Sequence, residues 1–446
     1  MAEGPQGITA ITVGGYKSIR DEMTIEIRPL TILAGANSSG KSSIMQPMLM
    51  MKQTLEAPYD PGPLMLDGPH VKFTKFEQLL SQAKGSGSRT LAAGFKFGRY
   101  SKVLCVFGFC SKNGLRQRSI ELSRMKVESR RRGNFELTPD LSYDEIIQLL
   151  PEASRKRMDE EDPGRIYLGW RIRNSRCFLQ FDRLRVGGRE DYLYSFDASD
   201  AVPDVKNSIA NVVHVPGLRG NPERSYPVTN AEPPKFTGPF QHYAASLLLH
   251  WMEEGNEKFN RVETDLIQLD LTRWVKPVRI DDANVEIQVG RLPVATKTNP
   301  KDDLVSIADV GIGVSQVLPV LVSLRAAEPG QMVYIEQPEL HLHPRAQVAL
   351  ADVLANAAKR GVRVVVETHS SLLLQGILTL IAREELDHED VILNWFDRDK
   401  QGCTRVEKAK LDSNGAYGDW PEDFGDVELG IQGRYLDAVA KREFGS

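Results

Sequence analysis

Residues 35–42 read Gly35-Ala36-Asn37-Ser38-Ser39-Gly40-Lys41-Ser42, which is the pattern G-x-x-x-x-G-K-[ST]. In this pattern the loop offers backbone N–H groups to phosphate oxygens, the lysine sits beside the β- and γ-phosphates, and the hydroxyl binds Mg²⁺. A lysine–phosphate pair about 4 Å apart is worth roughly 4 kcal/mol at an effective dielectric near 20. We therefore expect the loss of Lys41 to cost on the order of a thousandfold in nucleotide affinity or turnover.

The segments on either side of the loop fit a phosphate site. Residues 30–34 are apolar and partly β-branched, which predicts a buried strand. Residues 43–55 carry apolar side chains at helical spacing, so a helix should start at the loop, and its N-terminus favours an anion. We predict that ATP is bound by Gly35, Asn37, Ser38, Ser39, Gly40, Lys41, Ser42 and Ser43, and Mg²⁺ by Ser42.

The composition limits the class of protein. The chain has 446 residues, of which 41% are hydrophobic and 26% charged, and its formal net charge is −4. The length allows two or three domains. No apolar run is long enough for a membrane span, and no signal segment opens the chain. The four cysteines show no paired or metal-type spacing, so we expect a cytoplasmic protein without a membrane partner.

Outside the loop and its helix, the chain up to about residue 186 reads mainly as strands. Residues 8–13 and 23–27 alternate apolar and polar side chains, which predicts a small antiparallel sheet before the loop strand. An antiparallel β lobe is predicted from strand-like runs near residues 91–109, 117–128, 165–173 and 177–186. A helix at 143–150 and a charged run at 155–162 interrupt this lobe.

The lobe is locally basic. Residues 111–190 hold 18 Lys/Arg against 13 Asp/Glu, and the conspicuous arginines are Arg130, Arg131, Arg132, Arg171, Arg173 and Arg176. One interpretation is a surface that contacts nucleic-acid phosphates, with double-stranded DNA as the candidate. The other is a solvated face of a β lobe, because the excess is modest and few aromatic residues are interleaved.

Residues 200–275 change in character. Residues 213–220 predict a strand that ends in a loop, and Arg219 and Arg224 lie in and after it among prolines and glycines. Residues 240–268 predict a helical block from their apolar spacing. No sustained heptads are present, so no long coiled-coil arm is expected.

A second glycine-containing motif precedes an apolar helix predicted at 317–324. In residues 309–316, Gly311 and Gly313 would let the backbone approach a ligand. Ser315 and Gln316 lie near the expected helix start, where hydroxyl and N–H groups can face an anion. A simple capped helix would show the same pattern, and the motif gains meaning from its place just before the next one.

That next motif is an apolar strand followed by Glu336-Gln337-Pro338-Glu339. This pattern is typical of a Walker B strand, in which Glu336 would hold Mg²⁺ through water and its neighbours would orient the attacking water. His341 and His343 follow, but no third ligand stands at a suitable spacing, so zinc is not favoured. A further apolar strand at 362–366 leads to Glu367-Thr368-His369, and we expect His369 to sense the γ-phosphate at the same sheet edge.

Together these four motifs resemble the ABC-type ATPase heads of the SMC, RecF and OLD (overcoming lysogenization defect) group. More closely, the string at 336–344 resembles that of bacterial AAA-type ATPases that carry E-Q-P-E-L-H-L-H-P. The resemblance covers residues 8–56 and 304–376 and is weak across the middle. The stretch at 415–421 is similar to the tail of that bacterial family.

The resemblance implies that residues 311–316 act in trans, so that two heads enclose two ATP molecules between Lys41 of one subunit and Ser315 of the other. It also implies that His369 is the switch histidine. The usual catalytic glutamate of the group follows the Walker B acid directly, and here that position is Gln337. A glutamine orients water but is a poor base, so either Glu339 substitutes or hydrolysis is slow. The glutamine that helps bind Mg²⁺ is open between Gln46, Gln53 and Gln78.

Relatives in this group often act in anti-phage defence or DNA repair together with a nuclease. The short stretch after His369 leaves little room for a TOPRIM nuclease, and Asp397-Arg398-Asp399 reads as a turn at a strand end. We therefore expect any effector, such as a nuclease or toxin, to be a separate chain. The nucleotide-binding subunit of a membrane transporter is disfavoured by the large insertion.

The predicted fold class is α/β: an ABC-type P-loop ATPase head with a mixed central sheet, an antiparallel β lobe and an inserted helical block. The expected division places the two parts of the head at 1–90 and 301–446, the basic lobe at 91–200 and a helical/β insertion at 201–300. The expected function is a DNA-linked ATPase that dimerises around ATP. The alternative is an ATP-gated scaffold that sequesters and releases a toxin or nuclease with little hydrolysis.

Overall fold

The computed structural model describes residues 6–82, 89–111, 118–150, 167–186, 191–230, 235–294, 303–409 and 411–416, with 434–436, 439 and 442. The expected charged run at 155–162 and most of the tail at 415–421 lie outside these residues. No helix in the described part of the chain is long and apolar enough to cross a membrane.

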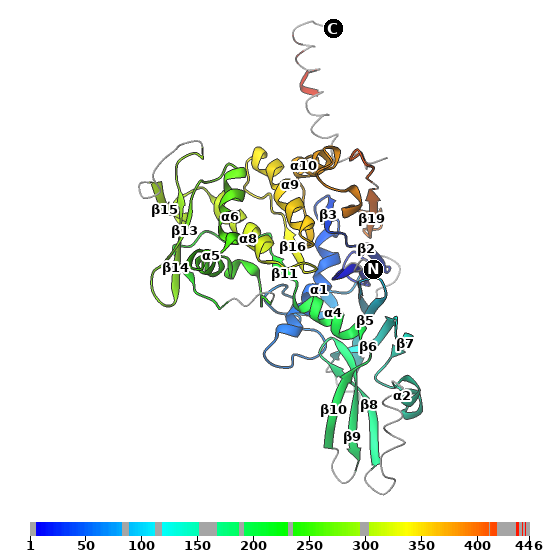
Figure 1. Ribbon diagram of the computed structural model, residues 1–446. Coiled ribbons are helices and arrows are strands. Elements are labelled where there is room, and N and C mark those ends of the chain that lie inside the picture. The colour runs from blue at the N-terminus through cyan, green and yellow to red at the C-terminus, as the bar shows by residue number, and fades with distance from the viewer. Residues whose placement is uncertain are drawn as a thin grey trace.

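A six-stranded mixed sheet forms the centre of the molecule (Figure 1). Its order is β11 (Val213–Val215), β16 (Met332–Glu336), β17 (Arg363–Glu367), β3 (Leu30–Gly35), β18 (Val391–Arg398) and β19 (Thr404–Ala409). The first five strands are parallel, and β19 runs antiparallel to β18. The inner strands are buried on both faces, which explains their nearly continuous apolar sequences.

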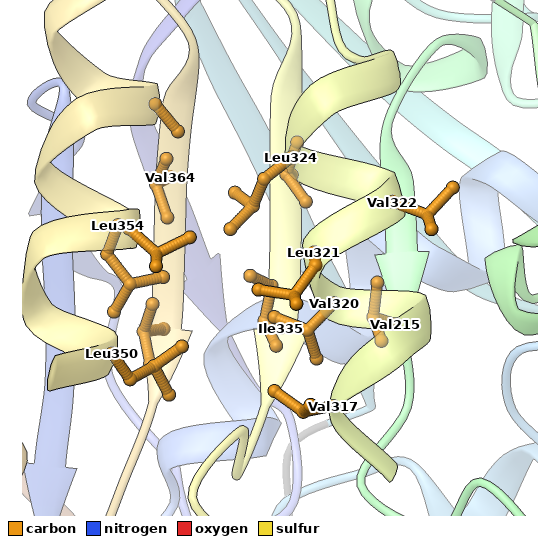
Figure 2. Packing of buried hydrophobic residues seen from close by; sticks show 14 of the residues in the cluster. Val215, Val317, Val320, Leu321, Val322, Leu324, Ile335, Leu350, Leu354 and Val364 are labelled. Carbon is orange, nitrogen blue, oxygen red and sulfur yellow. The ribbon is translucent and has the colours of Figure 1, made fainter. Parts of the chain in front are cut away.

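Helices cover both faces of this sheet. α8 (Ile312–Ala326) and α9 (Pro344–Lys359) pack on one face, α10 (Ser371–Ala382) packs on α9, and α1 (Lys41–Glu56) lies on the other face. Figure 2 shows side chains of α8 lying over β11 and β16, while Leu350 and Leu354 of α9 lie beside Val364 of β17. The central sheet therefore holds the P-loop strand between two separate apolar layers.

A second, antiparallel sheet packs against the α1 side. Its order is β2 (Met23–Glu26), β1 (Ile8–Gly14), β4 (Thr90–Phe97), β5 (Ser101–Ser111), β6 (Arg118–Ser129) and β7 (Gly133–Leu137). α4 (Ala201–Ala210) lies between α1 and the strands β4 to β6. The domain boundary expected at residue 91 falls inside this sheet.

The remaining strands form two smaller sheets. β8 (Tyr167–Ser175), β9 (Phe178–Val186) and β10 (Asp191–Asp197) form an antiparallel sheet that extends away from the body, close to α2 (Tyr143–Leu149) (Figure 1). α5 (Ala244–Glu253) and α6 (Glu257–Gln268) pack with β12 (Tyr226–Pro227), β13 (Val275–Arg279), β14 (Asn284–Gly290) and β15 (Leu304–Ser306).

The predicted α/β class, with a mixed sheet, an antiparallel lobe and a helical block, is confirmed. One helix start was predicted wrongly, since α8 begins at Ile312 and not at Val317. The expected turn after β18 is confirmed, because Asp399 Oδ1 accepts hydrogen bonds from the N–H groups of Gln401 and Cys403 at 2.9 Å. The strands β7, β10 and β12 to β15 were not predicted.

Several arginines of the basic lobe bind the protein itself. Arg176 donates to the carbonyl oxygens of Thr54, Leu55 and Ala57, so it satisfies the C-terminal end of α1. Arg132 likewise donates to two backbone carbonyls. Arg171 and Arg173 pair with the buried carboxylate of Asp182, at 3.5 and 2.8 Å. These contacts favour a structural role for four of the six arginines.

We predict that Arg176→Ala lowers the free energy of unfolding by about 1.5–3 kcal/mol, because charge-assisted hydrogen bonds to three otherwise unpaired carbonyls are lost. Urea unfolding followed by circular dichroism measures this difference. Arg130→Ala is the matched control, since Arg130 is exposed and lies over the Tyr100 ring. Equal stability of the Arg176 variant and the parent protein would contradict the capping role.

Candidate nucleotide-binding site

The ends of three neighbouring strands bring the predicted motifs together. Glu336 at the end of β16 is paired in register with Glu367 at the end of β17, and Glu367 is paired with Leu33 of β3. The P-loop follows β3 directly and leads into α1. Open parallel sheets bind ligands at this carboxyl edge, so motifs some 300 residues apart in the sequence meet at one site.

The P-loop depends on two glycines for its course. Gly35 and Gly40 have φ angles of 136° and 109°. A Cβ atom on Gly35 would lie 2.1 Å from the carbonyl oxygen of Phe396, and one on Gly40 would lie 2.3 Å from Oγ1 of Thr404. Thr404 Oγ1 also donates to the carbonyl of Ser39 at 2.8 Å. The antiparallel strand β19 therefore fixes the loop from outside.

Lys41 is folded back on the loop. Its Nζ donates to the carbonyls of Gly35 and Ala36 at 3.0 and 2.7 Å, and only 3% of the residue is exposed. Burial lowers the pKa of Lys41, and the charges of Glu367 and Glu339 partly oppose this shift. The predicted binding residues Asn37 and Ser38 are exposed at the loop tip, while Ser39 and Ser43 are buried.

The hydroxyl of Ser42 faces a carboxylate that we did not predict as a site residue. Ser42 Oγ lies 2.9 Å from both carboxylate oxygens of Glu367. Tyr334 Oη donates to Glu367 Oε2 at 3.0 Å. Burial raises the pKa of Glu367, and the hydrogen bond from Ser42 opposes the rise. The sequence did show an acid at the end of that strand, but which residues faced it could not be known without the register.

Glu336, the predicted Walker B acid, has other partners. Its carboxylate accepts from His214 Nε2 and from the Gly217 N–H, each at 3.1 Å. Burial raises the pKa of Glu336, but the hydrogen bond and charge of His214 outweigh this effect, so its pKa lies below the usual value. Arg219 Nη2 donates to the carbonyls of Glu336 and Gln337 at 2.8 and 3.3 Å. The loop after β11 thus holds the end of β16.

Glu339, which follows β16, forms hydrogen bonds with residues that follow β17. Its Oε1 accepts from Thr368 Oγ1 at 2.8 Å and from the His369 N–H at 2.9 Å, while its Oε2 is buried without a hydrogen-bond partner. Burial and the charge of Lys41 lower the pKa of His369, and a hydrogen bond with the backbone of Gly35 partly opposes this shift. Gln337 has a left-handed φ of 45°, and its N–H donates to the Glu367 carbonyl.

The second glycine motif, residues 309–316, leads into α8 and forms its first turn. Ser315 Oγ donates to the Ile312 carbonyl at 2.8 Å, and Gln316 Nε2 donates to the Gly220 carbonyl at 2.7 Å. A Cβ atom on Gly313 would lie 3.1 Å from the His341 carbonyl oxygen. Within the described part of the chain, no hydrogen bond joins Ser315 or Gln316 to the P-loop of the same molecule.

The three glutamines left open now differ. Gln53 binds backbone groups of residues 65–71, and Gln78 accepts from the backbone N–H groups of Thr74 and Lys75. Gln46 lies one helical turn after Ser42, and its Oε1 accepts from Tyr16 Oη and Lys17 Nζ at 2.8 and 2.7 Å. Gln46 is thus the candidate of the three that lies nearest to Ser42 along α1.

The donors present suit Mg²⁺ bound together with nucleotide. The Ser42 hydroxyl and the carboxylates of Glu336 and Glu367 are hard oxygen ligands, which Mg²⁺ prefers. Among the residues that the structure describes, no three His, Cys, Asp or Glu side chains gather as a metal cluster. Remaining ligands would come from phosphate and water. His343 Nδ1 accepts from the Arg345 N–H and caps α9.

Comparison with known proteins identifies the family. A family model described as "AAA domain, putative AbiEii toxin, Type IV TA system" matches residues 122–375. A second, described as "AAA ATPase domain", matches residues 7–112. The first match spans more than half of the chain, so the chain belongs to this AAA domain family, whose members are ATP-binding P-loop ATPases.

Among solved structures, the matches include SMC heads. An SMC head bound to the C-winged helix domain of ScpA has 13% identity and a TM-score of 0.46, with 91% of this chain and 98% of that chain covered. The SMC head domain from Thermotoga maritima has 11% identity and a TM-score of 0.39, with coverage of 90% and 98%. A third, derived from Pyrococcus furiosus and bound to the C-terminal domain of ScpA, has 11% identity and a TM-score of 0.43, with coverage of 96% and 99%. No curated protein matches the sequence significantly.

We predict that Gly40→Ala lowers the free energy of unfolding by about 2 kcal/mol or more, because the new methyl group meets Thr404 and the left-handed φ becomes strained. Urea unfolding measures the change, and a fluorescent ATP analogue reports the loss of the loop. Gly311→Ala is the matched control, since Gly311 has an ordinary φ of −57° and open space around its Cβ position. A Gly40→Ala protein as stable as the parent would contradict the assigned loop geometry.

Proposed function

We propose that this protein binds Mg²⁺·ATP at the edge formed by β3, β17 and β16 and hydrolyses it slowly as an ABC-type ATPase. The observation that carries the proposal is the meeting of three groups at that edge. These are the P-loop with Lys41 and Ser42, the carboxylates of Glu336 and Glu367, and the Glu339–His369 link.

The residues at this edge have different roles in the proposed reaction. Lys41 exchanges its two loop carbonyls for phosphate oxygens. Mg²⁺, held by Ser42 and the acids, would neutralise charge on the β- and γ-phosphates. His369, whose side chain has a hydrogen bond with the backbone of Gly35 in the P-loop, would contact the γ-phosphate. Gln337 orients the attacking water.

Slow hydrolysis is expected because a glutamine, Gln337, follows Glu336 directly in the sequence. Gln337 cannot take a proton. Glu339 is the other candidate, but its Oε1 already accepts from Thr368 and His369. Only its buried Oε2 is without a hydrogen-bond partner, so a small movement would be needed before it could accept a proton from water.

We further propose that ATP closes a homodimer. In the hydrogen bonds of the described residues, the start of α8, with Gly313, Ser315 and Gln316, is not joined to the P-loop of its own molecule. Its N–H groups would instead face the γ-phosphate held by a second copy. This arrangement supports the two-site sandwich expected from the SMC-like resemblance.

In the cell we propose a cytoplasmic, DNA-linked sensor or motor of an anti-phage or DNA-repair system, acting with a separate effector. The family is described as a "putative AbiEii toxin" of a toxin–antitoxin system, which supports a partner that must be held or released. An ATP-gated scaffold with little hydrolysis is the second candidate. Gln337 and the occupied Glu339 favour it.

Phosphate release over many turnovers, with and without double-stranded DNA, tests the function. We predict that Lys41→Ala lowers kcat/KM on the order of a thousandfold and that Glu336→Gln lowers it strongly, because Mg²⁺ loses a ligand. DNA-stimulated turnover lost in both variants supports the DNA-linked ATPase. Tight ATP binding without turnover supports the scaffold. Turnover that survives Lys41→Ala would contradict both.

A second prediction concerns the missing base. Gln337→Glu should raise kcat about tenfold or more, because a positioned carboxylate can take the proton of the attacking water. Gln375→Glu on the exposed face of α10 is the charge-matched control. Glu339→Gln should lower turnover if Glu339 is the base in the parent protein. A Glu339→Gln protein with the parental rate would remove Glu339 from that role.

A further inference from the structure

Among the residues that the structure describes, Glu367 is the carboxylate that contacts the hydroxyl of Ser42. Ser42 belongs to the first turn of α1, and its Oγ is 2.9 Å from each oxygen of Glu367. The side chain of Glu367 is buried, with 6% of the residue exposed. A hydroxyl has a single proton to donate, so its equal distance from both oxygens shows that the carboxylate is centred on the hydroxyl.

A second donor fixes this carboxylate. Tyr334, fully buried in β16, donates its hydroxyl to Glu367 Oε2 at 3.0 Å. The Tyr334 ring in turn stacks on His214, with ring centroids 5.5 Å apart and planes 9° from parallel. The position of Glu367 is therefore set from two neighbouring elements, α1 and β16.

Glu336 is held by a different set of groups. His214 and Gly217 occupy both of its carboxylate oxygens. The two acids are adjacent in register and raise one another's negative potential at the site. Lys41 is the cation of the P-loop, and its Nζ donates hydrogen bonds to the carbonyls of Gly35 and Ala36. Two neighbouring carboxylates and a hydroxyl are the hard donors that a divalent cation with phosphate would complement.

We propose that Glu367 is the principal protein carboxylate that holds the Mg²⁺ of Mg²⁺·ATP, together with the hydroxyl of Ser42. Glu336 contributes less than Glu367 to metal binding. The proposal rests on the function proposed above and departs from the expectation that Glu336 is the carboxylate that serves the metal beside Ser42. Glu367 fills the place beside Ser42 that no glutamine side chain takes in the described residues.

The test separates metal binding from nucleotide binding. Mn²⁺ replaces Mg²⁺, and the electron paramagnetic resonance signal of free aqueous Mn²⁺ gives the metal affinity in the presence of a non-hydrolysable ATP analogue. A fluorescent ATP analogue in EDTA gives metal-free nucleotide affinity. The variants are Glu367→Gln, Glu336→Gln and, as a charge-matched control, Glu407→Gln at an exposed position of β19.

We expect Glu367→Gln to weaken Mn²⁺ binding about 10–100-fold while nucleotide binding in EDTA is unchanged or tighter. Glu336→Gln should weaken Mn²⁺ less than Glu367→Gln does, and Glu407→Gln should leave it unchanged. Parental Mn²⁺ affinity in Glu367→Gln, or a larger loss in Glu336→Gln, overturns the proposal while the ATPase function stands. A parent protein that binds no nucleotide under either condition overturns the proposed function itself.

Glu367→Asp is a second variant, which keeps the test decisive where Glu367→Gln does not fold. It keeps the charge but shortens the side chain by one methylene group, so the carboxylate recedes from Ser42. We expect several-fold weaker Mn²⁺ binding with metal-free nucleotide binding retained. If Glu367→Gln fails to bind nucleotide in EDTA, Glu367→Asp decides, because parental Mn²⁺ affinity in that variant overturns the proposal.

Discussion

The parallel register of β16, β17 and β3 is the constraint on which the site depends. It places Glu336, Glu367 and the start of the P-loop at one edge, although the P-loop lies some 300 residues before the two acids in sequence. A register slip would turn every side chain of a strand to the other face, and the buried apolar sets on both faces of the sheet forbid this. Core packing therefore fixes the geometry of the polar edge.

At that edge, groups of the protein itself form hydrogen bonds with the polar and charged side chains that a bound nucleotide and Mg²⁺ would otherwise contact. Lys41 binds loop carbonyls, Ser42 binds Glu367, and Glu336 binds His214 and Gly217. Buried charges without partners cost several kcal/mol each, so these contacts stabilise the charged side chains at this edge. In the proposed function, binding of Mg²⁺·ATP would exchange these partners for the ligand, and its net free energy would be smaller than the sum of its contacts.

Local patterns predicted the parts that depend on few residues. The P-loop, the strands β3, β16 and β17 and the helix block follow from spacing alone, and the structure has them. The partners of Ser42, Glu336 and the buried arginines could not be predicted, because they join residues far apart in sequence. The basic lobe shows the same limit, since Arg132 and Arg176 look like surface charges in sequence but bind carbonyls inside the fold.

Hydrogen–deuterium exchange with and without Mg²⁺ and a non-hydrolysable ATP analogue tests the central claim most directly. If a single nucleotide site lies at this edge, peptides covering residues 35–46, 330–345 and 363–372 gain protection together, because residues at the ends of three strands contact one ligand. Lys41→Ala should abolish all three changes. Protection confined to one of these segments, or none in any, would contradict a single nucleotide site at this edge of the sheet.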